Sequence, residues 1–161
     1  GTGSGCIPIS LAKHKDAKVL AIDVSEDALL IAEENAINNG VEIDFIHQDI
    51  LQTNSLQKVD LIVSNPPYVL ESDKQMMSNN VLEYEPHLAL FVPANNPLQF
   101  YHAIATMATK KLKNNGVLYF EIHENYGQET LDMLSLKGFK ELELRKDLQG
   151  KDRMVKAVWK L

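Results

Sequence analysis

The sequence predicts a three-layer α/β/α fold, in which helices cover both faces of a mostly parallel sheet. Short apolar runs typical of buried strands alternate with segments of helical periodicity along nearly the whole chain. Small, polar and acidic residues follow these runs, as in loops at the carboxyl edge of a parallel sheet. The last two predicted strands, near residues 139–144 and 154–159, are separated by a short turn, so we expect them to form an antiparallel pair.

Length and composition are those of one soluble domain. The chain has 161 residues, of which 45% are hydrophobic and 24% charged, enough to bury one core. No apolar run reaches the roughly 18 residues of a membrane span, and no signal peptide is visible. The single cysteine, Cys6, excludes an internal disulfide and fits a reducing compartment. We therefore expect a cytoplasmic protein with one domain over residues 1–161.

Charge and metal-ligand spacing argue against stable nucleic-acid binding and against a metal site. A net charge of -6 argues against a large nucleic-acid surface, which needs clustered lysine and arginine. The five histidines show no ligand spacing, and one cysteine makes no thiolate site. We expect no stable nucleic-acid binding, no membrane binding and no metal.

The chain starts with a glycine-rich turn, Gly1-Thr2-Gly3-Ser4-Gly5. Such a turn normally follows a strand and opens a helix, with backbone N–H groups facing a ligand. A helix is predicted over residues 6–13, where Pro8 is tolerated in the first turn. The strand is not in the sequence, so we expect the sheet to lack its first strand. A tight strand–helix turn without a ligand is the alternative interpretation.

The next segments predict a strand, a helix and a strand. Residues 18–23 read as a buried strand that ends in Asp23, and Ser25 is a good helix N-cap. Asn-Asn-Gly at residues 38–40 stops the helix. Polar and apolar side chains alternate over residues 42–46, as in a strand. The expected apolar stripe of the helix consists of Ala28, Ile31, Ala32 and Ala36.

A short apolar run over residues 59–64 predicts a buried strand that ends in Asn65-Pro66-Pro67-Tyr68. Two consecutive prolines stop the strand and stiffen the backbone, because proline lacks an N–H and fixes its own φ. What remains is an amide side chain, carbonyl oxygens without local N–H partners, and an aromatic ring. This set suits the binding of a planar group that bears an NH2. Alternatively, the prolines only end the strand.

The remaining chain continues the alternation after a long irregular stretch. Residues 69–94 contain enough apolar side chains for a packed lid over the site. A helix starts near Pro97 and ends near Asn115-Gly116, and residues 117–122 form a strand. A further helix over residues 126–137 ends at Gly138.

Four stretches place polar groups at the carboxyl ends of predicted strands, so we expect them to converge on one edge of the sheet. A dinucleotide fingerprint is broken, since Cys6 stands where its third glycine belongs. Asp23 could accept both ribose hydroxyls of an adenosine cofactor, or could be a surface acid. Asp49 could accept the adenine amino group, with Ile50 beside the ring, or could cap a turn or helix.

This combination resembles the S-adenosylmethionine-dependent methyltransferases. Asn-Pro-Pro-Tyr after an apolar strand is the signature of those that methylate a planar NH2 nitrogen, either on a nucleobase or on glutamine. The chain looks like the catalytic domain of the glutamine methyltransferases of peptide chain release factors, without its N-terminal part. The segments that carry this closer likeness are Tyr84-Glu85-Pro86, Leu88-Ala89-Leu90, Glu121-Ile122, Gln128 and residues 147–153.

The resemblance implies S-adenosylmethionine as the cofactor and release factors as the protein substrate. It implies that the Asn65 side-chain oxygen and the Pro66 carbonyl hold the amide, on which Tyr68 stacks; these three are the expected catalytic residues. The expected cofactor-binding residues are Gly1, Thr2, Gly3, Gly5, Asp23, Val24, Asp49, Ile50 and Asn65. The expected substrate-binding residues are Asn65, Pro66, Pro67, Tyr68, Glu85 and Pro86.

Several alternatives stay open at this stage. The family has a strand before the glycine-rich turn and a helical domain ahead of it, which this sequence does not contain, and it differs over residues 92–96. An rRNA or DNA amino-methyltransferase, a ribosomal-protein glutamine methyltransferase and an inactive fragment are the other candidates. We expect weak cofactor binding by the 161 residues alone, and a monomer in which strand exchange is possible.

Overall fold

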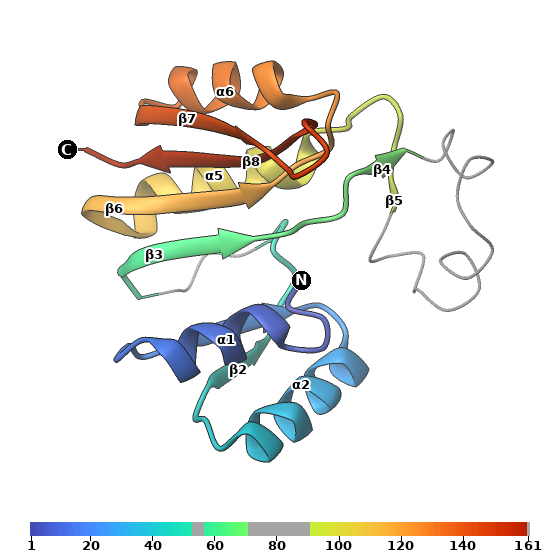
Figure 1. Cartoon of the computed structure of the whole chain (residues 1–161), viewed down its shortest axis with the longest axis vertical. Helices are drawn as coiled ribbons and strands as arrows, with labels where there is room; N and C mark the ends of the chain where they lie inside the picture. Colours follow the sequence, from blue (N-terminus) through green and yellow to red (C-terminus); the bar gives the residue numbers. More distant parts are fainter. Residues whose placement is uncertain (53–56, 71–90, 161) are drawn as a thin grey trace. The chain divides into compact units, whose positions relative to one another are not determined.

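The computed structural model describes residues 1–52, 57–70 and 91–160. The chain divides into two compact units, Gly1–Thr53 and Asn54–Leu161, called here the amino-terminal and carboxyl-terminal units. Both are α/β, as the sequence predicts (Figure 1). The predicted lid falls mostly on residues 71–90, outside the described residues.

The amino-terminal unit contains two helices and a pair of parallel strands. The elements are α1 (Cys6–His14), β1 (Leu20–Asp23), α2 (Glu26–Asn39) and β2 (Asp44–His47). The register runs from Leu20 opposite Asp44 to Asp23 opposite His47, so both strands end at one edge. All four elements were predicted, with boundaries displaced by one or two residues.

Helix α2 confirms the predicted caps and corrects the predicted stripe. The Ser25 side chain accepts a hydrogen bond of 3.2 Å from the Ala28 N–H, and Gly40 ends the helix with φ 67°. Leu29, Ala32 and Ala36 are buried, whereas Ile31 is 54% exposed. Ile31 precedes Ala32 by one residue, about 100° around the helix, which turns its side chain away from the unit's interior.

The carboxyl-terminal unit contains a mixed four-stranded sheet in the order β3-β6-β8-β7. β3 (Val59–Ser64) and β6 (Leu112–Glu121) are parallel, while β8 (Asp152–Val158) is antiparallel to both β6 and β7 (Lys140–Lys146). The predicted antiparallel pairing of the last two strands is confirmed. The remaining elements are the short parallel pair β4 (Val69–Leu70) and β5 (Phe91–Val92), and the helices α5 (Gln99–Lys111) and α6 (Gly127–Leu136).

The core of this unit lies between one face of the sheet and helices α5 and α6. Leu118 and Phe120 of β6 lie opposite Ala157 and Val155 of β8, and all four side chains are buried. Helix α5 contacts β6, helix α6 contacts β7 and β8, and the helices contact each other (Figure 1). Tyr101 of α5 packs edge-on against Phe120, with ring centroids 5.1 Å apart.

Among the described residues, β3 is the outer strand of its four-stranded sheet and no residue of it is buried, which corrects the prediction of a buried strand. Its Ile62 and Ser64 lie beside Leu118 and Phe120 on the face that the helices cover. Because side chains alternate along a strand, Leu61 and Val63 lie on the opposite face, where they are 39% and 36% exposed.

Strand β6 also starts earlier than predicted. Helix α5 ends at Lys111, and β6 begins at Leu112 instead of residue 117. Asn115 and Gly116, expected to end the helix, lie within the strand, and Asn115 has φ 63°. The register with β3 shifts between Val59 and Leu61, so the extra residues form an irregular start of the strand.

Candidate active site

In the amino-terminal unit, the glycine-rich turn and Asp23 are in contact. Asp23 ends β1 and is only 6% exposed. Its Oδ2 accepts a hydrogen bond of 2.9 Å from the Gly3 N–H, and its Oδ1 accepts one of 2.9 Å from the Ser25 N–H. The Gly1 ammonium lies 3.8 Å from Oδ2. Asp23 is therefore not a surface acid: it ties the turn to the end of the strand.

Two opposing effects act on the Asp23 carboxyl. Burial raises its pKa, but hydrogen bonds from the backbone of Gly3 and Ser25, with the Gly1 ammonium, favour the charged form. The net result is a pKa below the ordinary value for aspartate. Asp23 is consequently an ionised acceptor at neutral pH.

Asp49 follows β2 and caps a turn, which was its alternative interpretation. Its Oδ1 accepts a hydrogen bond of 2.9 Å from the Leu51 N–H, and its Oδ2 accepts one of 3.0 Å from the Gln52 side chain. The Gln48 N–H donates to the Asp23 carbonyl at 2.8 Å, which links the ends of β1 and β2. Since a carboxylate oxygen accepts more than one bond, the cofactor role of Asp49 stays a prediction.

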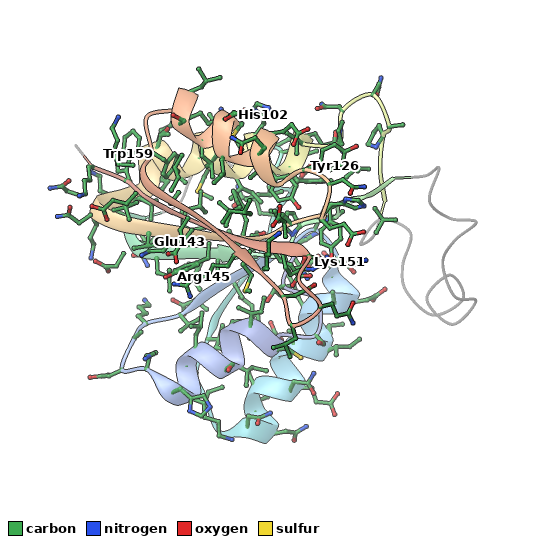
Figure 2. All side chains as sticks on the ribbon, turned by 45° about the horizontal axis from the view of Figure 1, so that its top comes forward. His102, Tyr126, Glu143, Arg145, Lys151 and Trp159 are labelled. Carbon is green, nitrogen blue, oxygen red and sulfur yellow. The ribbon has the colours of Figure 1, made fainter. Side chains whose placement is uncertain are left out.

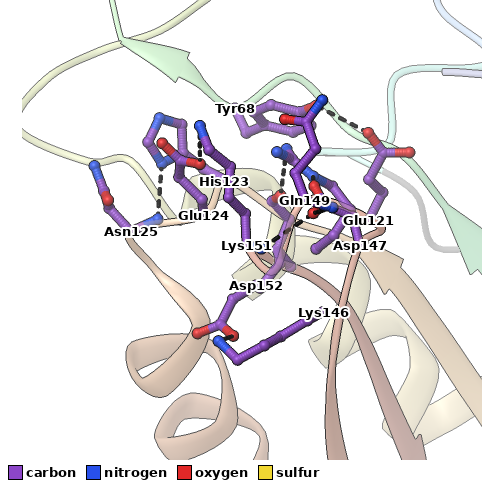
Figure 3. A network of polar contacts seen from close by, with 12 residues as sticks. Tyr68, Glu121, His123, Glu124, Asn125, Lys146, Asp147, Gln149, Lys151 and Asp152 are labelled. Carbon is purple, nitrogen blue, oxygen red and sulfur yellow. Dashed lines mark hydrogen bonds and ion pairs between the residues drawn. The ribbon is translucent and has the colours of Figure 1, made fainter.

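In the carboxyl-terminal unit, the Asn-Pro-Pro-Tyr segment leaves the carboxyl end of β3 as predicted. Asn65 is exposed, Pro66 is buried, and Pro67 and Tyr68 are half-buried. The Tyr68 hydroxyl donates a hydrogen bond of 2.9 Å to Oε1 of Glu121, the last residue of β6 (Figure 3). The segment is thus fixed to the neighbouring strand through its aromatic ring.

Further contacts surround this hydrogen bond. The rings of Tyr68 and His123 meet edge-on, with centroids 6.1 Å apart and planes at 77°. The Tyr101 hydroxyl donates to the Glu121 carbonyl at 3.1 Å. Arg153 Nη1 donates to the Ile122 carbonyl at 3.3 Å, so the residues just past β6 are held from several sides.

The surroundings of Tyr68 keep its hydroxyl protonated. Burial raises its pKa, the Glu121 carboxylate raises it further, and the positive charge of Arg153 opposes them in part. The net shift is upward, because a phenolate next to a carboxylate in a half-buried site is disfavoured. Tyr68 therefore acts as a hydrogen-bond donor and not as a base.

Sequence reasoning did not assign roles to Glu121, His123 or Arg153 at this site. The available signal was an acid, Glu121, near the end of the predicted strand over residues 117–122. Glu85 and Pro86 lie outside the described residues. The expected cofactor residues up to Ile50 belong to one unit and the Asn-Pro-Pro-Tyr segment to the other, so their convergence on one sheet edge stays a prediction.

The described residues contain neither a candidate metal site nor a helix that could span a membrane. No group of three or more histidine, cysteine, aspartate or glutamate side chains in this part of the chain could hold a metal ion. None of the helices over the same residues is long and apolar enough to cross a membrane.

The fold is that of class I methyltransferases. A methyltransferase from Pyrococcus furiosus superposes with a TM-score of 0.73 at 16% identity, over 100% of this chain and 73% of that one. A ribosomal protein L11 methylase from Lactobacillus delbrueckii subsp. bulgaricus gives a TM-score of 0.70 at 22% identity, over 100% and 68%. At these identities the likeness concerns the fold.

The sequence shows the family of the chain as well as its fold. Residues 1–88, more than half of its length, match the model of the methyltransferase small domain. The chain belongs to the methyltransferase small domain family.

Curated relatives share a more specific name, release factor glutamine methyltransferase. The protein from Flavobacterium psychrophilum is 56% identical over 98% of this chain and 56% of its own length. Those from Bacteroides thetaiotaomicron and Enterococcus faecalis are 47% and 40% identical, again over 98% of the chain and 58% and 57% of their own lengths. The chain thus spans little more than half the length of the curated relatives it matches.

Proposed function

We propose that this chain is the catalytic domain of an enzyme that methylates a glutamine side-chain amide in the Gly-Gly-Gln motif of peptide chain release factors. The methyl donor is S-adenosylmethionine, and the enzyme acts in the cytoplasm as a monomer. The observation that carries the proposal is the Asn-Pro-Pro-Tyr segment at the end of β3, with Tyr68 bonded to Glu121. The shared name of relatives at 40–56% identity supports glutamine as the target.

The residues of the amino-terminal unit fit an adenosine cofactor. Each Asp23 oxygen accepts one backbone N–H and keeps capacity for a ribose hydroxyl. Gly3 and Gly5 have φ 56° and 84°, which allows a tight turn whose backbone approaches a ligand closely. A Cβ at Gly5 would lie 3.1 Å from the Ala32 Cβ, so this glycine also seats the turn on α2.

The cofactor set in this proposal extends beyond the turn and Asp23. Val24 is exposed directly after Asp23, and Ile50 follows Asp49 at the end of β2. When bound, S-adenosylmethionine supplies a methyl group on a positively charged sulfur, which retains the electron pair of the broken bond. The proposed cofactor-binding residues are Gly1, Thr2, Gly3, Gly5, Asp23, Val24, Asp49 and Ile50. Asn65 completes the set but acts mainly on the acceptor amide, so it contributes little to cofactor affinity.

The Asn-Pro-Pro-Tyr segment supplies the groups that an amide nitrogen needs. An amide nitrogen is a poor nucleophile, because its lone pair is delocalised onto the carbonyl. The exposed Asn65 side-chain oxygen and the Pro66 carbonyl accept its two N–H groups, which holds the nitrogen and increases its electron density. Such preorganised acceptors contribute by positioning and electrostatics.

Tyr68 and water complete the reaction. The Tyr68 ring stacks on the amide plane and excludes water from the reacting side. The nitrogen forms its bond to the methyl carbon, and the resulting N-protonated amide is acidic enough to lose its proton to water. No side chain is required as a strong base, which agrees with a Tyr68 hydroxyl that remains protonated.

An Asn65→Ala variant of the complete gene product tests the role of this segment. We expect kcat to fall by about a hundredfold or more, as for loss of one preorganised polar group, while cofactor affinity stays nearly unchanged. Transfer of a labelled methyl group measures kcat, and calorimetry measures cofactor affinity. Asn95→Ala, at another exposed asparagine, is the matched control and should retain full turnover. Loss of cofactor affinity in Asn65→Ala would contradict the role assigned to Asn65.

A further inference from the structure

The contacts around Tyr68 define a cluster, called here the Tyr68 clamp, that consists of Tyr68, Glu121, His123 and Arg153. We propose that Glu121 is a positioning residue for methyl transfer: it accepts the Tyr68 hydroxyl and thereby holds the ring at the angle needed to cover the acceptor amide. Arg153 supports Glu121 and is itself held by the turn between β7 and β8. The inference rests on the proposed function and assigns a role to residues that the function above leaves unused.

The clamp fixes the Tyr68 ring at two points. Glu121 Oε1 accepts the hydroxyl at the far end of the ring, 2.9 Å away, and the His123 ring meets its side with centroids 6.1 Å apart (Figure 3). A tyrosine ring moves mainly about two side-chain torsions, so one contact at its tip and one at its side restrict both. Without Glu121 the half-buried hydroxyl loses this acceptor, and the ring is free to turn.

Arg153 places a positive charge beside this pair. Its electrostatic interaction extends to both the Tyr68 hydroxyl and the Glu121 carboxylate. Its Nη1 donates to the Ile122 carbonyl at 3.3 Å, and the Ile122 N–H donates to the Arg153 carbonyl at 2.9 Å. Arg153 is therefore joined by main chain and side chain to the residue that follows Glu121, and its positive charge interacts with the side chain that accepts the Tyr68 hydroxyl.

The turn between β7 and β8 holds the arginine in place. Asp147 Oδ2 accepts from Arg153 Nε at 3.2 Å, while Asp147 Oδ1 accepts the N–H groups of Gln149 and Lys151 at 2.9 and 3.0 Å. The Asp147 N–H donates to the Lys151 carbonyl at 2.8 Å, which closes the turn. Residues 147–153, notable in the sequence without an assigned role, thus form the support of the clamp.

Positioning and base catalysis predict different behaviour for Glu121. A base would have to receive a proton from the substrate, but Glu121 Oε1 already accepts the hydrogen of a protonated phenol. A positioning role predicts a lower kcat with an unchanged shape of the pH profile, since no proton passes through the carboxylate. It also predicts that the effect disappears when the Tyr68 hydroxyl is removed.

The test is a double-mutant cycle on the complete gene product. We expect Glu121→Ala to lower kcat by about 10- to 100-fold, the range for loss of a hydrogen bond to a charged group. Cofactor affinity, from calorimetry, should change by less than about threefold. Tyr68→Phe should lower kcat to a similar degree. The variant that carries both substitutions should have no lower kcat than either single variant, because one interaction connects the two residues. Glu121→Gln keeps an acceptor oxygen and should restore most of the turnover.

Two residues of β7, half-buried Glu143 and exposed Arg145, provide matched controls. Glu143 and Arg145 form an ion pair of 2.7 Å on this strand, outside the clamp (Figure 2). Glu143→Ala and Arg145→Ala should keep wild-type kcat, whereas Arg153→Ala should lower it. Thermal melts followed by circular dichroism are the check that each variant is folded.

Three outcomes would overturn the inference while leaving the proposed function intact. The first is wild-type kcat in Glu121→Ala. The second is a double variant whose loss of kcat equals the product of the single losses, and the third is a pH profile of Glu121→Gln that loses a limb; either of these shows that Glu121 acts without Tyr68. If the wild-type protein transfers no methyl group to a release factor, the proposed function itself fails, and the positioning role fails with it.

Discussion

Two side chains have pKa values that bear on the proposed function. They are the hydroxyl of Tyr68 and the carboxyl of Asp23. The pKa of Tyr68 is raised and that of Asp23 is lowered. Each shift favours the protonation state that the proposed role requires: a donating phenol beside Glu121, and an ionised acceptor beside the glycine-rich turn. Both shifts can be measured.

The Tyr68 shift predicts a late step in a spectrophotometric tyrosine titration. The difference between wild type and Tyr68→Phe isolates the ionisation of this one hydroxyl. We expect its midpoint above pH 10, the ordinary value for tyrosine, because ionisation would place two negative charges side by side. A midpoint at or below pH 10 would show that the hydrogen bond to Glu121 does not form in solution.

The Asp23 shift predicts a loss of stability in acid. A lowered pKa in the folded state stabilises the fold above the unfolded pKa of about 4, and this contribution disappears as the pH falls through the folded value. The stability difference between wild type and Asp23→Asn, from urea unfolding, should therefore be largest near neutral pH and shrink below about pH 4. A difference that does not vary with pH would contradict this role of the charge.

At the scale of elements, helix boundaries were predictable where a single residue determines them. Ser25 and Gly40 bound α2 as expected, because an N-cap hydroxyl and a glycine with positive φ act locally. The burial of Leu29 in place of Ile31 and the edge position of β3 were not predictable, since both depend on what packs beside the element.

The Ser25 cap gives a direct test of the helix assignment. Ser25→Ala removes the acceptor of the Ala28 N–H and should lower the free energy of unfolding by about 1 kcal/mol. Ser135→Ala, at an exposed position in the last turn of α6, is the matched control and should change stability little, because alanine favours a helix. Equal effects of the two substitutions in chemical denaturation would argue against a capping role.

In the candidate site, too, local contacts were predictable and contacts between distant segments were not. The contact between the glycine-rich turn and Asp23 was predictable, because both lie on consecutive segments of one strand–helix unit. The contact between Tyr68 and Glu121 was not, because it depends on β3 and β6 being neighbours although the two residues are 53 positions apart in sequence. Strand order is a property of the whole sheet, and one sequence does not reveal it.

At the scale of the whole molecule, charge and family bear on the proposed substrate. The net charge of -6 disfavours a phosphate backbone as a partner. The chain belongs to a methyltransferase family, and its relatives named for release factors are up to 56% identical. These observations favour a protein substrate over RNA or DNA for the Asn-Pro-Pro-Tyr chemistry.

The sheet edges lead to a prediction about oligomeric state. β1 and β3 are edge strands of their sheets, and unpaired edges can exchange strands between copies. Exposed Asp60 on β3 forms an ion pair of 2.8 Å with Lys113, and charges on an edge strand oppose such pairing. We therefore expect the mass of a monomer in light scattering. A dimer that persists on dilution would indicate strand exchange.

The most direct test of the proposed function is the site of methylation. The complete gene product is incubated with S-adenosylmethionine and either a release factor or ribosomal RNA, and the products are examined by mass spectrometry. We predict one added methyl group on the glutamine side chain of the Gly-Gly-Gln motif and none on the RNA. With Asn65→Ala, methylation of the factor should be slower by about a hundredfold or more. A methyl group on the RNA, with the glutamine unmodified, would contradict the proposed function.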